Sequence, residues 1–266
     1  MSGTRFPPGS GRPLTGEAVL TRAFRLLRAF EAADGALSLT ALARRSGLPK
    51  SSTLRIATQL VAVGALERRD SGDFVIGLGL LEVASLAPRG HGLRAAALPY
   101  MQDLQQVTRQ HVLLAVREDT DAILVERLSA LDATPVKYRV GGRLPLDATG
   151  VGLALLAHAP ESVRAAVMDG PAATVQDAAA GRRVRQLVAA ARAEGVVALT
   201  IANPVAGGPA EITTVAAPIL DARGHALGAI SLVSPSTGEP RTGLRLALRT
   251  ASLAIARAAG QRPRPN

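Results

Sequence analysis

The stretch SLTALARRSGLPKSSTLR, residues 38–55, contains two amphipathic helix patterns separated by a short glycine-containing turn. Ser38 is suited to cap the first helix, whose apolar positions recur within residues 39–43. The chain then passes through Ser46-Gly47. Pro49 suits the first turn of the second helix, because its missing N–H needs no intrahelical partner there. Two short helices joined by a tight turn predict a helix-turn-helix unit.

The second helix has an apolar face and a polar face. The residues predicted to face the core are Leu54, Ala57 and Val61, with Ile56 and Leu60 beside them. The residues of the opposite face are Lys50, Ser51, Ser52, Arg55 and Gln59. Short hydroxyls and a helix N-terminus can approach phosphates, while Arg and Gln side chains reach base edges in the major groove. The pattern favours a DNA-recognition helix. The alternative is a small helical packing unit whose polar face is only solvated.

The sequence on both sides extends this unit. Upstream, the apolar residues that recur at helical spacing from about Ala18 are Leu20, Phe24, Leu27 and Phe30. They predict an earlier helix that ends near Asp34-Gly35. Downstream, residues 65–68 and 74–76 predict a hairpin around a turn at 69–73, with a basic shoulder suited to the phosphate backbone. Residues 14–77 are therefore predicted to form a winged helix-turn-helix.

The predicted DNA contacts fall into two groups. The residues assigned to base edges or groove-lining phosphates are Ser51, Ser52, Arg55 and Gln59. The residues assigned to phosphates are Arg44, Arg45, Lys50, Thr53 and Arg69. Because one helix-turn-helix reads only a few base pairs, a dimer on double-stranded, pseudo-palindromic operator DNA is expected, with half-sites about one helical turn or a multiple apart.

Composition and charge limit the classes of protein. The 266 residues are 47% hydrophobic, which suffices for a buried core. The absence of Cys excludes disulfide scaffolds, thiol enzymes, zinc fingers and iron–sulfur proteins. The net charge is +10, and residues 1–90 hold half of it, with 12 basic and 7 acidic side chains. Nonspecific packaging of nucleic acid is disfavoured, because the charge is spread over a structured, apolar chain rather than concentrated in a tail.

The ends of the chain carry no predicted anchor or leader. Residues 1–13 are rich in Gly, Pro and Ser, include two Arg, and lack the apolar core of a signal peptide. We expect them to form a disordered basic arm, and residues 261–266 to form a disordered tail. No uncharged apolar run reaches the roughly 18 residues that a bilayer requires. A cytoplasmic protein with no membrane association is therefore expected.

The rest of the chain alternates helices and strands. Residues 78–90 are predicted to hold a linker helix ended by the breaker Ala87-Pro88-Arg89-Gly90. In the domain predicted over residues 91–260, helices are expected at 93–104, 149–158, 161–168, 181–194 and 242–259. Strands are expected at 111–117, 122–128, 136–140, 196–201, 213–220 and 226–233. The segment 141–146 is expected to be a loop. The predicted fold class is α+β, with a mixed sheet flanked by helices in this second domain.

The opening stretch resembles the helix-turn-helix of the IclR-type bacterial transcriptional regulators, above all in residues 47–53 followed by Arg55. The continuation, which ends in Gly77-Leu78-Gly79, resembles the wing and linker of that family, and residues 141–156 and 215–219 resemble its second domain. The resemblance implies a winged helix-turn-helix, a linker helix and a GAF-like mixed α/β effector-binding domain. It also implies DNA binding that a small metabolite modulates, by homodimers paired through their amino-terminal part and often assembled into dimers of dimers.

The same resemblance implies a site for a small organic acid. The residues it nominates are Ala148, Thr149 and Gly150 for backbone N–H contacts, and Thr214 and Ser231 for side-chain hydroxyls. A helix N-terminus stabilises a carboxylate without a basic side chain. The family often has Cys where Thr214 stands and an acidic stretch near residues 201–209, so a different effector is expected here. The scarcity of aromatic residues argues against a stacking pocket for a large aromatic ligand.

No catalytic, metal or cofactor site is predicted. The four histidines, His91, His111, His158 and His225, are far apart, and no nucleophile elbow or phosphate loop is present. The Gly77-Leu78-Gly79 pair is too short for a dinucleotide fingerprint and follows a wing strand. A small-molecule-binding or hydrolytic enzyme with an accessory helical domain is the alternative. It would need a nucleophile–base pair or a ligand cluster in 91–266, which the sequence lacks.

Overall fold

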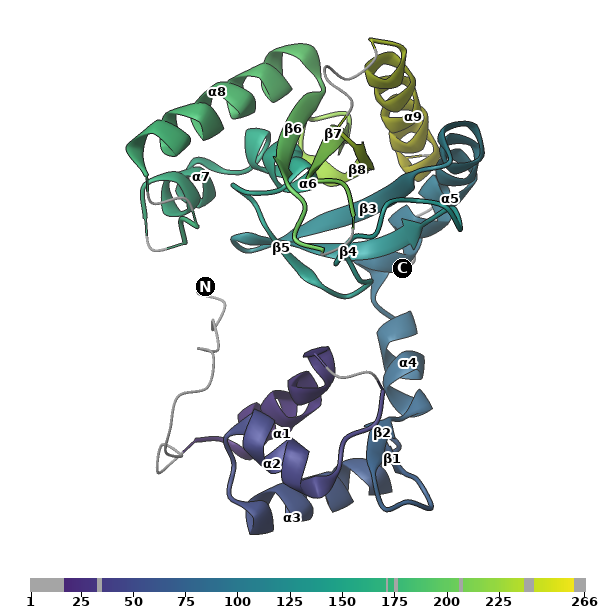
Figure 1. The fold of residues 1–266 in the computed structure, drawn as a ribbon, viewed down its shortest axis with the longest axis vertical. Coiled ribbons are helices and arrows are strands. Elements are labelled where there is room, and N and C mark those ends of the chain that lie inside the picture. The colour runs from purple at the N-terminus through teal and green to yellow at the C-terminus, as the bar shows by residue number, and fades with distance from the viewer. Residues whose placement is uncertain are drawn as a thin grey trace. The chain divides into compact units, whose positions relative to one another are not determined.

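The computed structural model describes residues 17–32, 35–170, 172–174, 177–205, 208–236 and 242–260. The predicted arm, 1–13, and the predicted tail, 261–266, lie outside these ranges. The chain divides into two compact units, one up to Ala87 and one from Pro88 (Figure 1). The predicted fold class is confirmed, since a helical unit with a small hairpin precedes a unit built on a sheet flanked by helices.

The first unit contains the predicted helices and hairpin. Its elements are α1 (Val19–Arg28), the 3-10 helix η1 (Ala29–Ala32), α2 (Leu39–Ser46), α3 (Lys50–Ala62), β1 (Leu66–Arg68), β2 (Phe74–Ile76) and α4 (Leu78–Ser85). The Ser38 hydroxyl accepts a hydrogen bond from the Ala41 N–H at 3.2 Å, so the predicted cap of α2 is confirmed. Gly47 ends α2 in the left-handed conformation, with φ 64°.

The core of this unit uses other faces of α1 and α3 than the sequence predicts. On α1, Leu26 is fully buried, whereas Leu20 and Phe24 are 75% and 58% exposed. On α3, Thr53 is buried and Leu54 is exposed. Both helices carry two apolar stripes of the same period, and periodicity alone does not say which stripe meets the neighbouring helices. The inward assignment of Leu54 was therefore wrong, and on α1 the buried stripe passes through Leu26 rather than through Leu20 and Phe24.

Gly77 and Gly79, at the start of α4, allow this helix to pack closely against the turn before β1. The Gly77 N–H donates to the Ala65 carbonyl at 3.0 Å, and the Gly79 N–H donates to the Gly64 carbonyl at 3.1 Å. A Cβ atom on Gly77 would lie 2.2 Å from the Gly64 carbonyl oxygen, and one on Gly79 would lie 2.8 Å from it. Only glycine lets the backbone of α4 approach the turn before β1 this closely.

The second unit is a six-stranded sheet with helices on both faces. Its helices are α5 (Pro88–Thr108), α6 (Gly150–Ala157), α7 (Glu161–Met168), α8 (Ala178–Glu194) and α9 (Thr242–Gly260). Its strands are β3 (His111–Glu118), β4 (Asp121–Leu128), β5 (Arg143–Pro145), β6 (Val197–Ala202), β7 (Glu211–Leu220) and β8 (Ala226–Pro235). The strand order is β5-β4-β3-β8-β7-β6, and each of these pairings is antiparallel. The sheet is thus antiparallel rather than mixed.

Two local predictions in this unit were wrong. The linker helix α4 ends at Ser85, just before the predicted breaker, but residues 88–90 begin α5 instead of forming a connection, because proline is well accommodated in a first helical turn. Residues 136–140 are irregular, and the strand lies a few residues later, in β5. Val136 and Tyr138 both pack against the core, which produces the alternation typical of a strand without pairing to a neighbour.

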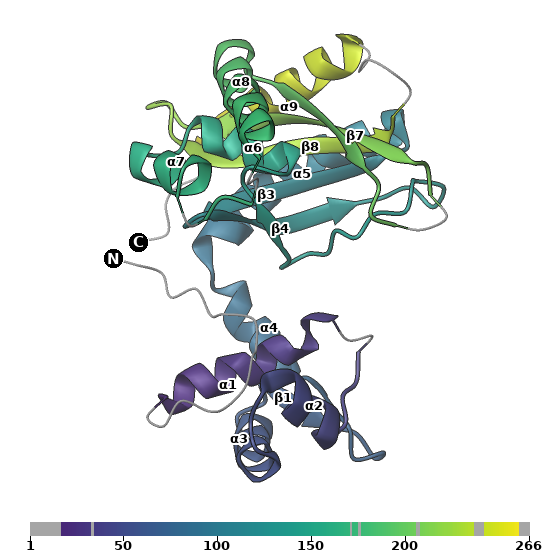
Figure 2. The same ribbon diagram turned by 60° about the vertical axis from the view of Figure 1, so that its left-hand side comes forward.

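The helices form two layers. Helices α6, α7 and α8 lie on one face of the sheet, and α5 and α9 lie on the other (Figure 2). Every residue of α6 is buried, as expected for a helix that is apolar on all sides. Its first residue, Gly150, lies against Thr214 of β7. None of the described helices combines the length and apolar character needed to cross a bilayer.

Candidate DNA-binding face and effector cavity

The predicted recognition face of α3 is a continuous exposed stripe. Ser51, Arg55 and Gln59 follow one another at four-residue spacing and are exposed, as is Lys50 at the start of the helix. Ser52 is half-buried beside them. The described part of the chain offers the side chains of Lys50, Arg55 and Gln59 no hydrogen-bond or ion-pair partner. Their charge and donors are therefore available to an external ligand.

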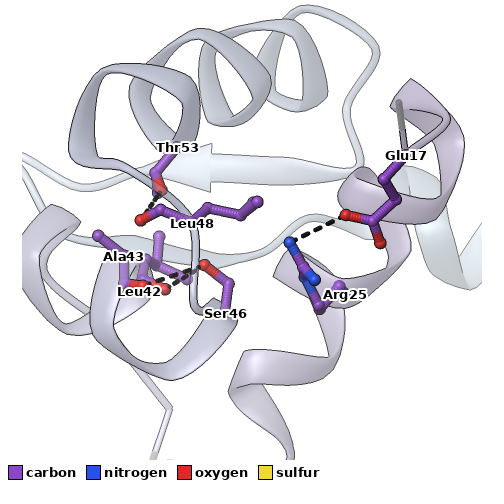
Figure 3. Close-up of polar contacts among 7 residues, drawn as sticks. All are labelled: Glu17, Arg25, Leu42, Ala43, Ser46, Leu48 and Thr53. Carbon is purple, nitrogen blue, oxygen red and sulfur yellow. Dashed lines mark hydrogen bonds and ion pairs between the residues drawn. The ribbon is translucent and has the colours of Figure 1, made fainter. Parts of the chain in front are cut away.

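Thr53 does not belong to this face. Its side chain is fully buried, and its hydroxyl donates to the carbonyls of Pro49 at 3.1 Å and Leu48 at 3.5 Å. Figure 3 shows the hydroxyl turned toward the Leu48 carbonyl, inside the first turn of α3. The predicted phosphate contact by Thr53 is corrected, because a hydroxyl in this position is closed off from DNA. Its place in the sequence, three residues before the buried Ile56, puts it on the inward stripe.

The three predicted arginine contacts outside α3 are all exposed. Arg45 also has a structural role, because its guanidinium donates to the Ala29 carbonyl at 3.2 Å and ties α2 to η1. Arg44 and Arg69 have no side-chain partner among the described residues. Next to Arg69, the guanidinium of Arg68 lies 5.7 Å from the centre of the Phe74 ring and braces the wing.

The predicted effector residues meet at a small cavity of about 10 Å³ between α6 and the sheet, which is room for about one water molecule. Thr149, Gly150, Thr214 and Ser231 line it, whereas Ala148 does not. The lining residues that the sequence analysis missed are Leu113, Tyr138, Leu144, Val151 and Val233. A Cβ atom on Gly150 would lie 2.4 Å from Cγ2 of Thr214, so glycine keeps this end of the cavity open.

The hydroxyl groups around the cavity differ in whether other protein groups satisfy their hydrogen bonds. Thr149 caps α6: its hydroxyl donates to the Pro145 carbonyl at 2.7 Å and accepts from the Gly152 N–H at 3.1 Å. The Ser231 hydroxyl is fully buried and has no hydrogen-bond partner within the described ranges. Buried polar groups are nearly always paired, so an unpaired one at a cavity points to a ligand or water. Within the described ranges, Ser231 is thus a buried lining residue whose hydroxyl has unsatisfied hydrogen bonds.

The polar groups of the cavity favour an anion. The N–H groups of Gly150 and Val151, at the start of α6, have no acceptor among the described residues. A helix N-terminus carries a partial positive charge and binds carboxylates through such groups. No acidic side chain lines the cavity. The remaining lining is apolar apart from Tyr138, whose phenol pKa is raised by burial and which therefore stays neutral near pH 7.

A larger, more open groove lies between α7 and α8. Two of its arginines pair within it, Arg164 with Glu161 and Arg185 with Asp169, whereas Arg192 has no ion-pair partner among the described residues. The groove therefore keeps one arginine, Arg192, whose guanidinium is available to an anion.

The described histidines have the environments of ordinary packed or surface side chains. Among the described residues, no three His, Asp or Glu side chains gather in a metal-binding arrangement. His111 is buried between Ser129 and the Thr134 carbonyl, and burial lowers its pKa, with a smaller contribution from Arg127. Burial also lowers the pKa of His158, aided by Arg192. The exposed His225 lies 3.5 Å from Asp221, and the side chain of His91 is outside the described atoms.

The buried His111 and the half-buried His158 predict a loss of stability in mild acid. Their folded pKa lies below the unfolded value of about 6.5, so the unfolded chain binds more protons as the pH falls below 6.5. The free energy of unfolding should be flat above this value and fall below it by up to about 1.4 kcal/mol per pH unit for each histidine. Urea unfolding between pH 7.5 and 5.5 measures this slope.

His111→Gln should reduce the slope, and His225→Gln, at an exposed position, should leave it unchanged. An unaltered slope in His111→Gln would show that this histidine does not titrate as its burial implies.

An exposed polar stripe on the second helix of a winged helix-turn-helix, in one chain with a second domain built on a sheet flanked by helices, is the architecture of a DNA-binding transcriptional regulator. The chain belongs to the IclR family. The family model described as "Bacterial transcriptional regulator IclR C-terminal" matches residues 87–257, and the "IclR helix-turn-helix domain" matches residues 19–70.

Individual relatives agree with this assignment. The chain is 30% identical over 251 residues to the glycerol operon regulatory protein of Streptomyces griseus, covering 91% of this chain and 96% of that protein. It is 30% identical over 161 residues to the transcriptional repressor IclR of Escherichia coli K12, and the match spans 59% of either chain. The crystal structure of an IclR homolog from Microbacterium hydrocarbonoxydans, complexed with 4-hydroxybenzoate, is 34% identical. It matches with a TM-score of 0.80 over 92% of this chain and 100% of that one.

Proposed function

We propose that this protein binds operator DNA sequence-specifically and that a small organic acid in the cavity modulates this binding. The observation that carries the proposal is the unpartnered, fully buried hydroxyl of Ser231 beside the start of α6. The same chain thus contains a cavity with unsatisfied hydrogen-bond donors and, on α3, the exposed polar stripe. The family membership and the ligand of the Microbacterium homolog support the same conclusion.

The cavity is small. Its volume of about 10 Å³ is far below the roughly 300–1,000 Å³ of most small-molecule pockets, so binding an effector requires the cavity walls to move apart. A carboxylate at Ser231 and the N–H groups of Gly150 and Val151, with a short apolar body beyond it, satisfies both the polar and the apolar lining. No nucleophile–base pair faces the cavity among the described residues, which supports a receptor rather than a hydrolytic enzyme.

Dimers assembled through the first unit are part of the proposal. The apolar side chains of α4 that are exposed are Leu78, Leu81, Val83 and Leu86, at 69%, 64%, 67% and 78%. An exposed apolar surface of this kind typically marks a protein interface. A second copy covering α4 would also supply the second helix-turn-helix that a pseudo-palindromic operator requires. We place the protein in the cytoplasm, where its DNA is.

An electrophoretic mobility shift tests the proposal. The full-length protein is mixed with the promoter DNA next to its own gene, at physiological salt and with excess competitor DNA. We expect a specific complex whose stability changes when 4-hydroxybenzoate or another small carboxylic acid is added. Equal binding to the competitor would contradict sequence-specific regulation.

Arg55→Ala should lower specific affinity for the operator by about 1–3 kcal/mol, because an arginine in the middle of the exposed stripe is suited to read a guanine. Lys50→Ala, at the end of the same helix, should instead weaken binding to all sequences and reduce the salt dependence by about one charge. Affinities for operator and random DNA across a salt series distinguish the two. If Arg55→Ala weakened both DNAs equally, Arg55 would be a phosphate contact rather than a base contact.

A further inference from the structure

The groove between α7 and α8 is large enough to hold a small molecule. Its volume is about 560 Å³, within the roughly 300–1,000 Å³ that is typical of small-molecule pockets. The two helices lie side by side in the second unit (Figure 1), and one stripe of each lines the groove. Ala165 of α7 and Ala189 and Ala193 of α8 are among the lining residues, and their short side chains leave the space between the helices unfilled.

The two helices run in opposite directions along the groove. At one end, Asp169, directly after α7, pairs with Arg185 of α8 at 2.8 Å. At the other end, His158 lies three residues before the start of α7. Burial lowers the pKa of His158 and Arg192 lowers it further, which places the Arg192 guanidinium near this histidine. The two ends of the groove are therefore marked by Arg185 and Arg192.

Arg192 carries the charge that the groove does not balance. Three arginines and two carboxylates line the groove, and two of the arginines pair with the carboxylates, Arg164 with Glu161 and Arg185 with Asp169. Arg192 is exposed and has no ion-pair or hydrogen-bond partner within the described ranges. The remaining charge of +1 attracts a monoanion, whereas the two carboxylates disfavour a ligand of higher negative charge.

The wall between the two ends is aliphatic. Met168, Val188 and Ala189 line it, and the groove has no aromatic side chain among its described lining residues. Arg185 and Arg192 are seven residues apart on α8, which is about 10 Å along a helix that rises about 1.5 Å per residue. Methionine adapts its shape to the group packed against it. An extended alkyl chain suits a surface of this length and chemistry.

We propose that the groove between α7 and α8 is a ligand site in its own right and that it binds a medium-chain alkyl carboxylate. Arg192 binds the carboxylate, because a guanidinium can donate two parallel hydrogen bonds to the two oxygens. The alkyl chain lies against Met168, Val188 and Ala189. The groove shares no lining residue with the cavity between α6 and the sheet, so this site is separate from the one assigned to the effector.

Calorimetric titration of the full-length protein with octanoate, butyrate and octylamine tests the chemistry of the ligand. Butyrate has the same carboxylate and a shorter chain, and it should bind at least about tenfold more weakly than octanoate, because each buried CH₂ group contributes to affinity. Octylamine has a chain of similar length and the opposite charge, and it should not compete with octanoate. Octylamine that bound as tightly as octanoate, or octanoate that did not bind, would overturn the proposal.

Variants of α8 test the role of Arg192. Arg192→Ala should weaken octanoate about tenfold, and Arg192→Lys, which keeps the charge but loses the paired hydrogen bonds, should weaken it less. Arg183→Ala is the matched control, because Arg183 is another exposed arginine of α8 and does not line the groove. Equal octanoate affinity in the wild-type and Arg192→Ala proteins would overturn the proposal.

Filling the groove tests where octanoate binds. Ala189→Phe places a ring in the groove and should abolish octanoate binding, whereas Ala179→Phe, at an exposed position of α8 outside the groove, should leave it unchanged. Ser231→Ala alters the cavity and should also leave octanoate affinity unchanged. Octanoate binding that responded to Ser231→Ala and not to Ala189→Phe would place the ligand in the cavity and overturn the proposal.

Discussion

Ser231→Ala is expected to stabilise the free protein and, at the same time, to weaken benzoate binding about 10- to 100-fold. The Ser231 hydroxyl is buried without a partner, and such a group costs about 1–3 kcal/mol when no ligand satisfies it. Replacing it by a methyl group removes that cost. It also removes a hydrogen bond to the effector carboxylate, and hydrogen bonds to charged groups contribute about 1.5–3 kcal/mol.

Urea unfolding without ligand and calorimetric titration with benzoate measure the two effects. Ser234→Ala is the matched control, because Ser234 lies on the same strand, β8, and an odd number of residues away, so it faces the other side of the sheet. It should leave benzoate affinity unchanged. A Ser231→Ala protein that is less stable and binds benzoate normally would show that this hydroxyl has a structural partner and no role in binding.

Gly77→Ala is expected to abolish operator binding while leaving effector binding intact. The new methyl group would lie 2.2 Å from the Gly64 carbonyl oxygen, which belongs to the backbone and cannot rotate away. Overpacking in a well-packed region costs about 1–3 kcal/mol, and a backbone collision of this depth costs more. The first unit is small and has little stability to lose. The second unit has its own core, so the cavity should persist.

Mobility shift with operator DNA and calorimetric titration with benzoate, on the same full-length variant, separate the two functions. Gly92→Ala is the control, since nothing lies within 4 Å of a Cβ at that position and the helix tolerates alanine. It should bind DNA normally. Normal operator affinity in Gly77→Ala would mean that α4 can shift away from the turn before β1 without cost.

The helix-turn-helix was predictable because its signals are local. Ser38 caps α2 and Gly47 ends it through interactions within a few residues, and Pro49 immediately precedes α3. Which apolar stripe faces inward was not predictable. Leu20 and Phe24 have the spacing of a buried face, and only the positions of α2 and α3 decide that Leu26 is buried instead. The burial of Thr53 has the same origin.

At the cavity, the identity of several lining residues was predictable, but the state of their hydrogen bonds was not. The family resemblance nominated Thr149, Gly150, Thr214 and Ser231, which the structure brings together from α6, β7 and β8. It could not indicate that Thr149 uses its hydroxyl to cap α6 while Ser231 has no partner. Hydrogen-bond satisfaction depends on every neighbouring group, and those neighbours come from distant parts of the chain.

By itself the sequence determined the class of the protein, its helices and most of its strands, because caps, turns and periodicity act over a few residues. Only the tertiary structure decided which side chains are available to a ligand. Tyr138 lines the cavity, and the Arg127 guanidinium, 11 residues away along the chain, donates to its carbonyl. The reason is physical: burial and unmet hydrogen bonds are properties of the packed surroundings, which no local pattern records.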